Sequence, residues 1–444
     1  METPNKGDSR WGSLFKNDLQ GMLLPILLIT IIGSVNIFSA TYISSIYENT
    51  GLLGYFLKHM TFLLLSMAVG VILYRYDYRQ LQKPHMLQRI MIVTLIGMIL
   101  VLVIGAVING ARRWIVIGPV SIQPSEFAKL AALIWTAAKL STMRKWGKPR
   151  HINPLINLQG YFSERISYML PMLIWPTIFA GLTILQPDMG TTVLIFGFSF
   201  VLIYLAGFDG KLAFAIAGFL GFIAARMSPY RWERIQSWFD PWPHAQDMGY
   251  QTVQGLLAVG SGGILGEGFM QGTSKYFYLP EAHTDFAFAV WAQEMGFIGA
   301  VFVVVLIAAF TYFGFRISNK ARDEFGKWLA MGITLLISGQ ALFNIAMVCG
   351  IMPVTGVPLP FISYGGSSLL MNFMAIGLLA SVGRRNVEGV KQVGTAEALP
   401  SLREETQSRF KPAAPKSTQK TEMPGPFRPR ETKKPTRRRS RSER

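Results

Sequence analysis

Charged residues are scarce in this chain. Asp, Glu, Lys and Arg make up 15% of the 444 residues, whereas half of all residues are apolar. A soluble domain carries about 25% charged residues, because water has to solvate its surface. The apolar runs here are also long enough to cross a bilayer core, which takes about 20 helical residues. The composition excludes a soluble fold for most of the chain and predicts an all-α polytopic membrane protein.

Cysteine is nearly absent, and so are the motifs of soluble enzymes. The single cysteine, Cys349, excludes an intramolecular disulfide and a cysteine-based metal site. There is no phosphate-binding P-loop, and GSGGILGEG lacks the strand-then-helix setting of a dinucleotide site. No Ser-His-Asp arrangement is legible. The chemistry must therefore be sought where polar residues meet the apolar runs.

Ten apolar runs are candidates for transmembrane helices, and their glycines and prolines are tolerated in lipid. The expected spans are residues 20–41, 53–74, 88–108, 122–140, 165–185, 190–207, 211–228, 286–314, 327–350 and 365–382. We therefore predict a short N-terminal segment over residues 1–19, a membrane domain over 20–383 and a tail over 384–444.

The distribution of Lys and Arg predicts the orientation, since cytoplasmic loops carry an excess of these residues. With the N-terminus inside, the inner segments hold 17 Lys and Arg and the outer loops hold 5, without counting the tail. An even number of helices agrees with this arrangement. Both termini are predicted to be cytoplasmic.

The net charge of +18 is concentrated in the tail. Seventeen of the 43 Lys and Arg lie between Arg384 and Arg444, among many Pro, Ser and Thr residues. Such a composition predicts disorder. We interpret the tail as a segment that lies against anionic membrane lipids rather than nucleic acid. A dedicated role in binding a partner protein is the alternative.

Residues 229–285 form the longest predicted outer loop, and loops of this length are usually functional. Trp232, Trp238 and Trp242 suit a membrane–water interface. The apolar middle, VQGLLAVGSGGILGEGF, is too short and too rich in glycine to span a bilayer. We expect a partly re-entrant segment covered by protein, because irregular backbone cannot face lipid.

Two polar motifs lie where outer loops meet apolar helices, and ionisable groups in such places are candidate site residues. In ARRWIVIGPVSIQPSEFAKL, Glu126 and Lys129 are three residues apart and can form a structural ion pair on one helix face. Arg112 and Arg113 stand out because outer loops carry so few basic residues. In QPDMGTT, Asp188 is either a helix cap or a site residue.

A third motif, YLPEAHTDFAFAVWAQEMGF, lies where the long loop enters the eighth expected helix. Glu281, His283 and Asp285 cluster there within five residues. Asp285 could cap the helix, although three titratable groups are more than a cap needs. Glu294 lies about 13 Å deeper along the helix and must face protein or a water-filled cavity.

A fourth motif, GIMPVTGVPLPFISYGGSSLLMNF, leads into the tenth expected helix. Its polar and glycine residues could present hydroxyl and backbone donors to an anion. The alternative is a turn followed by close helix packing through small residues. The residues concerned are Ser363, Gly365, Gly366, Ser367 and Ser368.

Together these stretches resemble the SEDS family of shape, elongation, division and sporulation proteins, which includes RodA, FtsW and SpoVE. The matching pieces are GARRWIVIGPVSIQPSEFAKL, QPDMGTT, GYQTVQGLLAVGSGGILGEGF, YLPEAHTDFAFAVWAQEMGF and MPVTGVPLPFISYGGSS, in the family's order over about residues 15–385. The resemblance implies ten transmembrane helices in the bacterial cytoplasmic membrane. It also implies polymerisation of lipid II into peptidoglycan strands at the outer face, with a class B penicillin-binding protein as partner.

The resemblance also implies residue roles. The family's essential acid corresponds to Asp285, its important tryptophan to Trp114, and its paired acid and base to Glu126 and Lys129. The Val-Pro before Leu-Pro in the fourth motif is more like RodA than FtsW, which implies elongation, with division as the alternative. Gln293 departs from the family, where an acidic residue is common at this position.

The implied glycosyl transfer needs a base for the attacking hydroxyl, worth about 10²–10⁴ in rate, and positive charge at the leaving pyrophosphate. Asp285 is the candidate base. Five outer cations are candidates for the pyrophosphate, with or without a divalent cation: Arg112, Arg113, Arg231, Arg234 and Lys275. The rival function is transport of the lipid-linked precursor along a polar path. That path would be lined by Glu126, Lys129, Asp188 and Glu294.

Overall fold

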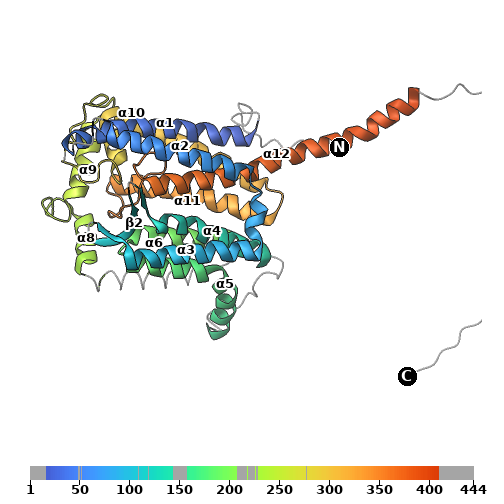
Figure 1. Ribbon diagram of the computed structural model, residues 1–444, viewed down its shortest axis with the longest axis horizontal. Coiled ribbons are helices and arrows are strands. Elements are labelled where there is room, and N and C mark those ends of the chain that lie inside the picture. The colour runs from blue at the N-terminus through green and yellow to red at the C-terminus, as the bar shows by residue number, and fades with distance from the viewer. Residues whose placement is uncertain are drawn as a thin grey trace, which may run out of the picture. The chain divides into compact units, whose positions relative to one another are not determined.

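The protein is described here by a computed structural model that is almost entirely helical (Figure 1). It describes residues 17–48, 51, 53–108, 110–118, 120–143, 158–207, 218, 226, 229–276 and 278–409. The long helices are α1 (Asp18–Tyr47), α2 (Gly54–Arg75), α3 (Pro84–Ile104), α4 (Pro124–Met143), α5 (Leu158–Leu185), α6 (Met189–Leu205), α10 (Ala287–Asn319), α11 (Glu324–Val348) and α12 (Gly366–Arg409). Shorter helices are η2 (Tyr78–Gln82), α8 (Pro229–Phe239) and α9 (Tyr250–Ser261).

The helices confirm the prediction of an all-α polytopic membrane protein. Six of them are long and apolar enough to cross a membrane, namely α1, α2, α3, α10, α11 and the Gly366–Val387 part of α12. The shorter apolar segments Met169–Leu185 and Met189–Leu205 belong to α5 and α6. Each expected span overlaps a helix except residues 211–228, which lie outside the described residues apart from two positions.

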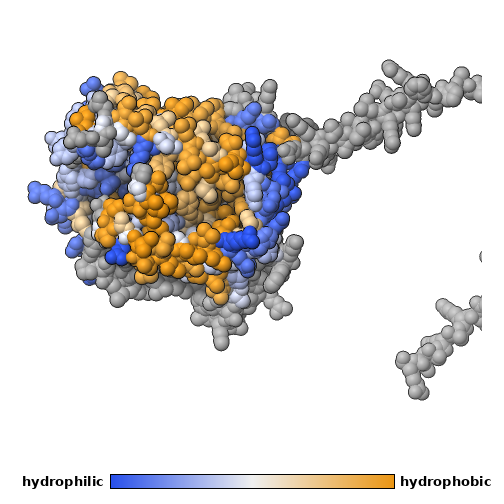
Figure 2. All heavy atoms as spheres, in the orientation of Figure 1, coloured by the Kyte–Doolittle hydropathy of each residue, from blue (hydrophilic) through white to orange (hydrophobic). Residues whose placement is uncertain are grey.

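Much of the helix surface is apolar. Figure 2 shows apolar residues across the middle of one face, between hydrophilic regions at its two ends. Large side chains of α1, α2 and α3 are exposed, including Leu27, Leu64, Ile72, Val93 and Val103. Exposed apolar surface of this extent would be a liability in water. It is the surface expected to face lipid.

Helix α4 lies at the centre of the bundle and contacts α3, α5, α6 and α11. Its sequence, PSEFAKLAALIWTAAKLSTM, is rich in alanine, which allows helix backbones to approach closely. Nearly every residue of α4 is buried. The charged groups of Glu126 and Lys129 on this helix therefore lie in the protein interior.

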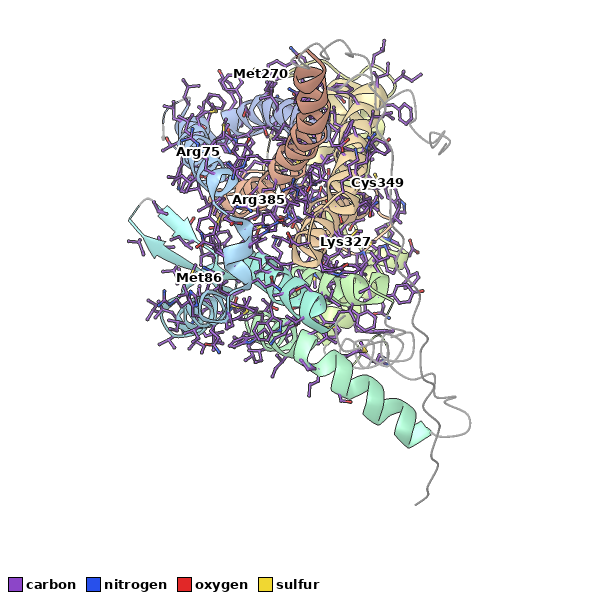
Figure 3. The ribbon with its side chains drawn as sticks, turned by 90° about the vertical axis from the view of Figure 1, so that its right-hand side faces the viewer. Arg75, Met86, Met270, Lys327, Cys349 and Arg385 are labelled. Carbon is purple, nitrogen blue, oxygen red and sulfur yellow. The ribbon has the colours of Figure 1, made fainter. Side chains whose placement is uncertain are left out.

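Ion pairs join several chain segments at one end of the bundle, the end predicted to be cytoplasmic. At the start of α1, Asp18 pairs with Arg316 at 2.9 Å and with Lys320 at 2.7 Å. Asp77, before η2, pairs with Arg385 of α12 at 2.6 Å. Figure 3 views the molecule from this end. The start of α1 and residue 385 thus lie at the same end, as an even number of crossings requires.

A three-stranded antiparallel sheet follows α3, where the sequence predicted only the end of a helix and a loop. The strands β1 (Ala106–Ile108), β2 (Ala111–Ile117) and β3 (Val120–Ile122) pair in chain order. Gly110 and Gly118 have positive φ values of 75° and 59°, as tight hairpin turns require. The β-branched residues of ARRWIVI fit such a strand.

Helix α10 is broken at Gly296, whose φ of 67° and ψ of −168° are not helical. The long loop fills the break with its backbone. Phe297 N–H donates to Gly263 O at 2.9 Å, and Gly268 N–H donates to Glu294 O at 3.1 Å. The apolar, glycine-rich segment after α9 therefore packs directly on protein, which agrees with the expected protein-covered loop.

The last helix extends further than expected. The compact unit Met1–Lys391 contains the helices described above up to the first part of α12, and a second unit comprises Gln392–Arg444. Helix α12 continues to Arg409, whereas the sequence predicted disorder from residue 384. Ala, Glu, Gln, Lys and Arg are frequent over this stretch, and all favour helix when nothing else decides the conformation.

We expect Gly296→Ala to destabilise the protein by about 2 kcal/mol or more, because its φ and ψ are essentially restricted to glycine. A Cβ atom there would also lie 2.3 Å from Gly266 N. Thermal unfolding in detergent measures the effect. Gly197→Ala is the matched control, since open space surrounds that glycine and alanine favours helix. Equal stability of the two variants would contradict the role of the break.

Candidate active site

Asp285 lies in the turn that leads into α10. Its carboxylate lies beneath the last loop, which joins α11 to α12. The helix begins after Phe286 without a side-chain cap, so the capping interpretation of Asp285 is wrong. A Cβ atom on Gly356 would lie 3.3 Å from Asp285 Oδ2, and the φ of Gly356 is +73°. Glycine therefore lets the loop backbone approach the carboxylate closely.

The surroundings of Asp285 favour its protonated form. Burial, followed by the negative charges of Glu281 and Asp188, raises its pKa to about 7, against the opposing effects of Arg113 and Arg234. A carboxyl group with a pKa near the working pH can both accept and release a proton. Two predicted acids and two predicted arginines therefore act electrostatically on this one carboxylate.

Arg113 and Arg112 are neighbours on β2 but differ in their surroundings. Arg113 is half-buried and donates through Nε to Gln186 O at 3.1 Å and also to Pro187 O. Arg112 is exposed and makes only a long contact, 3.5 Å, to Leu102 O. Successive side chains of a strand point to opposite faces. The site thus contains Arg113 and not Arg112.

Helix α8 contributes a second arginine. Arg234 donates to Val354 O at 3.3 Å and so ties α8 to the last loop. Arg231 also lies on α8, but its side chain is outside the described part of the structure. Of the predicted cations whose side chains the structure describes, Arg113 and Arg234 are the two that act on Asp285.

Lys275 has a different environment. Its ammonium group lies 2.8 Å from Glu294 Oε1 and 3.0 Å from Ser39 Oγ, and the Lys275 and Glu294 side chains are 1% and 2% exposed. Ser39 also donates to Glu294 Oε1 at 2.6 Å. Glu294 faces protein, as expected. Because the ion pair is sealed from the surface, we leave Lys275 out of the candidate site.

Asp188 caps helix α6. Its carboxylate accepts hydrogen bonds from Thr191 N–H at 3.1 Å and the Thr191 hydroxyl at 2.9 Å. Gln123 Nε2 donates to the same carboxylate at 3.3 Å. The capping interpretation is confirmed, and the group also contributes negative charge near Asp285.

Glu126 and Lys129 form the predicted ion pair inside the bundle. The two side chains are 3% and 1% exposed, and their charged atoms are 2.8 Å apart. Lys129 also donates to Gln340 Oε1 at 2.9 Å, and Gln340 Nε2 donates to Pro358 O at 2.9 Å. The pair therefore supports the last loop from below rather than reaching the surface.

The serines of the fourth motif are used within the protein. Ser363 Oγ accepts a hydrogen bond from Leu359 N–H at 2.8 Å, and Ser367 Oγ accepts one from Gln123 N–H at 2.9 Å. A Cβ atom on Gly366 would lie 2.9 Å from the Phe62 ring, and Gly365 precedes it. These contacts favour the turn and small-residue packing over an anion site.

His283, Glu281 and Trp114 surround the site without joining Asp285 directly. The ring of His283 packs on Tyr55 and Tyr364 with centroid distances of 5.8 and 5.6 Å. Burial lowers the pKa of His283, so it is neutral at pH 7. Glu281 is exposed and accepts a hydrogen bond from the Thr284 hydroxyl at 2.6 Å. Trp114 is half-buried on β2.

The sequence interpretation missed the amides of α11. Asn344 Nδ2 donates to both Asp285 O and Val357 O at 2.7 Å. Gln340 lies one helical turn before Asn344, and both residues are fully buried. Polar side chains four residues apart in an apolar helix share a face and indicate a shared function. That pattern could have identified them.

A pocket of about 190 Å³ adjoins the Asp285 site. It shares Arg234 and Val354 with that site. Its lining residues are Arg234, Ser237, Trp238, Asp247, Met248, Tyr250, Gln251, Thr252, Pro280 and Val354. Aromatic rings lie there beside a carboxylate, an amide and a guanidinium, so both stacking and hydrogen bonding are available to a ligand.

Metal-ligating residues are not grouped in the part of the chain that the structure describes. No set of three or more His, Cys, Asp or Glu side chains is close enough there to hold an ion.

Comparison with known proteins identifies the family. Residues 20–388 match the FtsW, RodA and SpoVE family of cell cycle proteins. The chain belongs to this family. Among its relatives, stage V sporulation protein E of Bacillus subtilis is 35% identical, covering 83% of this chain and 97% of that protein. A probable peptidoglycan glycosyltransferase FtsW of the same organism is 32% identical, covering 81% and 89%.

Solved structures of family members have the same fold. A chain of a peptidoglycan synthase complex aligns with a TM-score of 0.64 and 27% identity, covering 83% of this chain and 98% of that one. The rod shape determining protein RodA of Thermus thermophilus aligns with a TM-score of 0.57 and 26% identity, covering 84% and 99%. The family resemblance seen in the motifs is therefore confirmed over the membrane domain.

We expect Glu126→Ala and Lys129→Ala each to destabilise the protein by about 3–5 kcal/mol, because either change leaves one buried charge unpaired. The double variant should lose less than the sum of the two. Thermal unfolding in detergent measures these losses. Lys320→Ala is the control, since its pair with Asp18 is half-exposed and worth about 1 kcal/mol or less. Additive losses would show that Glu126 and Lys129 do not interact.

Proposed function

We propose that this chain polymerises lipid II into glycan strands at the outer face of the bacterial cytoplasmic membrane, with Asp285 as the base. As a family member it is a peptidoglycan glycosyltransferase. The observation that carries the proposal is the Asp285 carboxyl group, whose pKa of about 7 suits proton transfer. It lies at the end of the bundle opposite the one that the Lys and Arg distribution predicts to be cytoplasmic.

The reaction joins two lipid-linked sugars. A sugar 4-hydroxyl attacks the anomeric carbon of the second sugar, and Asp285 accepts the hydroxyl proton. The bond from that carbon to the pyrophosphate oxygen breaks, and undecaprenyl pyrophosphate leaves as an anion, so no general acid is required. Arg113 and Arg234 are the proposed sources of positive charge for the leaving group. Both arginines also lower the pKa of Asp285, which places their charges near this carboxylate.

The pocket beside Arg234 is the proposed place for a saccharide portion of a substrate. Trp238 and Tyr250 offer ring surfaces, while Asp247 and Gln251 offer groups that hydrogen-bond to hydroxyls. Trp238 Nε1–H already donates to Gly350 O at 3.0 Å, which fixes the orientation of that ring. A single carboxylate beside a single guanidinium suits a neutral sugar better than a second pyrophosphate.

A class B penicillin-binding protein is the proposed partner. The support is the solved peptidoglycan synthase complex that coordinates polymerisation with crosslinking, one chain of which shares this fold. Glycan polymerisation on this chain would supply strands to a separate crosslinking enzyme.

Asp285→Asn should abolish glycan synthesis from lipid II in detergent, because an amide cannot accept the proton. The variant should fold and be at least as stable as the parent at pH 8, since the folded state disfavours the charged carboxylate. Gel analysis of the glycan and thermal unfolding measure both effects.

Asp240→Asn is the matched control for this test, because Asp240 is exposed on the same long loop. It should polymerise at the parental rate. Substantial polymerisation by a folded Asp285→Asn protein would refute the assignment of the base. Failure of the parent to polymerise lipid II in detergent, where membrane sides do not exist, would favour the transporter instead.

The finer role proposed is elongation, supported by the RodA-like sequence VTGVPLPF and by the RodA structure. Division is the second candidate, because the FtsW and SpoVE relatives favour it. Depletion in the source organism separates the two. Loss of an elongation enzyme should give rounded cells, whereas loss of a division enzyme should give filaments, and filaments would overturn the elongation role.

A further inference from the structure

Residues 354–358, which we call the strap, lie over Asp285 and are held from several sides. Arg234 donates to Val354 O, and a Cβ atom on Gly190 would lie 2.7 Å from Thr355 O. The following residue, Gly356, lies against the Asp285 carboxylate, since a Cβ atom on it would be 3.3 Å from Asp285 Oδ2. The strap has no regular secondary structure, so its position depends on these outside contacts.

Helix α11 supplies the strap's hydrogen bonds from below. The Nδ2 group of Asn344 donates one of its hydrogens to Val357 O and the other to Asp285 O, both at 2.7 Å. Gln340 donates to the next strap carbonyl, Pro358 O, at 2.9 Å. The strap and the backbone of Asp285 are thereby attached to the same nitrogen atom.

We infer that Asn344 is a positioning residue for the base: it fixes the spacing between the Asp285 carboxylate and the strap that covers it. The inference rests on the proposed function, in which Asp285 accepts the proton. Asn344 does not itself contact the carboxylate.

Packing alone does not explain an asparagine here. Asn344 is fully buried, and within the described part of the chain its Oδ1 atom has no hydrogen-bond partner. Burying such an oxygen costs about 1–3 kcal/mol, which a leucine of similar size would avoid. The two donor bonds are what the amide provides and a leucine cannot. Both end on the segments that determine the environment of the carboxylate.

The strap also explains why the Asp285 carboxyl group is shielded from water. Burial is the largest cause of its raised pKa. A strap released from Asn344 would admit water to the carboxylate, and hydration favours the charged form. Loss of Asn344 should therefore lower the pKa of Asp285 toward its ordinary value. A residue that only stabilised the fold would not produce this shift.

The test compares Asn344→Leu, which removes both donors, with Asn344→Ser, which retains one. A hydrophobic carbodiimide, which modifies protonated carboxyl groups, is applied to each purified full-length protein over a pH series. Mass spectrometry then locates the modification at Asp285. Polymerisation of lipid II over the same series is the second measurement. Asn372→Leu is the control, a buried amide on α12 with no hydrogen-bond partner among the described residues.

In the parent, labelling of Asp285 should be lost, and polymerisation gained, as the pH rises through about 7. For Asn344→Leu both midpoints should move to lower pH by about one unit or more, and the maximal rate should fall about tenfold or more. The midpoints of Asn344→Ser should lie between those of the parent and those of Asn344→Leu. If Asn344→Leu does not fold, Asn344→Ser is the variant that tests the inference. Asn372→Leu should keep the parental midpoints.

Unchanged midpoints in a folded Asn344 variant would overturn the inference, even if its rate were lower. The labelling result needs no substrate, so it is independent of the proposed function. A shifted labelling midpoint in a protein that makes no glycan would uphold the positioning by Asn344 and refute the polymerase. A shifted midpoint in Asn372→Leu would show that loss of any buried amide suffices, and would also overturn the inference.

Discussion

The backbone of α10 imposes the constraint on which the outer half of the molecule depends. No water is available in a bilayer core, so a helix broken there must have its peptide groups satisfied by protein. The break at Gly296 leaves such groups on both sides, and residues 263–268 provide their partners. The long loop is therefore part of the helix's own hydrogen bonding, and its position fixes the turn that carries Asp285.

Buried charges reinforce this arrangement at two depths. Lys275 and Glu294 join the loop to α10 just before the break, while Glu126 and Lys129 join α4 to α11 through Gln340. A charge removed from water is tolerated only when paired and hydrogen-bonded, so each pair selects one arrangement of its segments. Asp285 differs, because burial raises its pKa and several more distant groups of both signs then modify it.

Hydropathy was sufficient to predict the nine long helices of the described residues, because the bilayer imposes both their length and their composition. It could not reveal the sheet after α3, where apolar strand residues read as the continuation of a helix. Nor could it separate Lys275 from Arg234, since both are isolated cations in one outer loop and only folding buries the first. The family motifs identified Asp285, but the amide of Asn344 acts on it from a residue 59 positions away.

A base at a membrane surface has to meet two opposing requirements. It must be dry enough that its pKa approaches the working pH, yet open enough for a sugar hydroxyl to reach it. A carboxylate inside the bundle, such as Glu126, is buried away from any substrate, and an exposed one such as Glu281 can be reached but is surrounded by water. Asp285, the proposed base, meets both because a thin cover, with Gly356 against the carboxylate, replaces bulk protein above it. The amides of α11 allow a cover without secondary structure to stay in place.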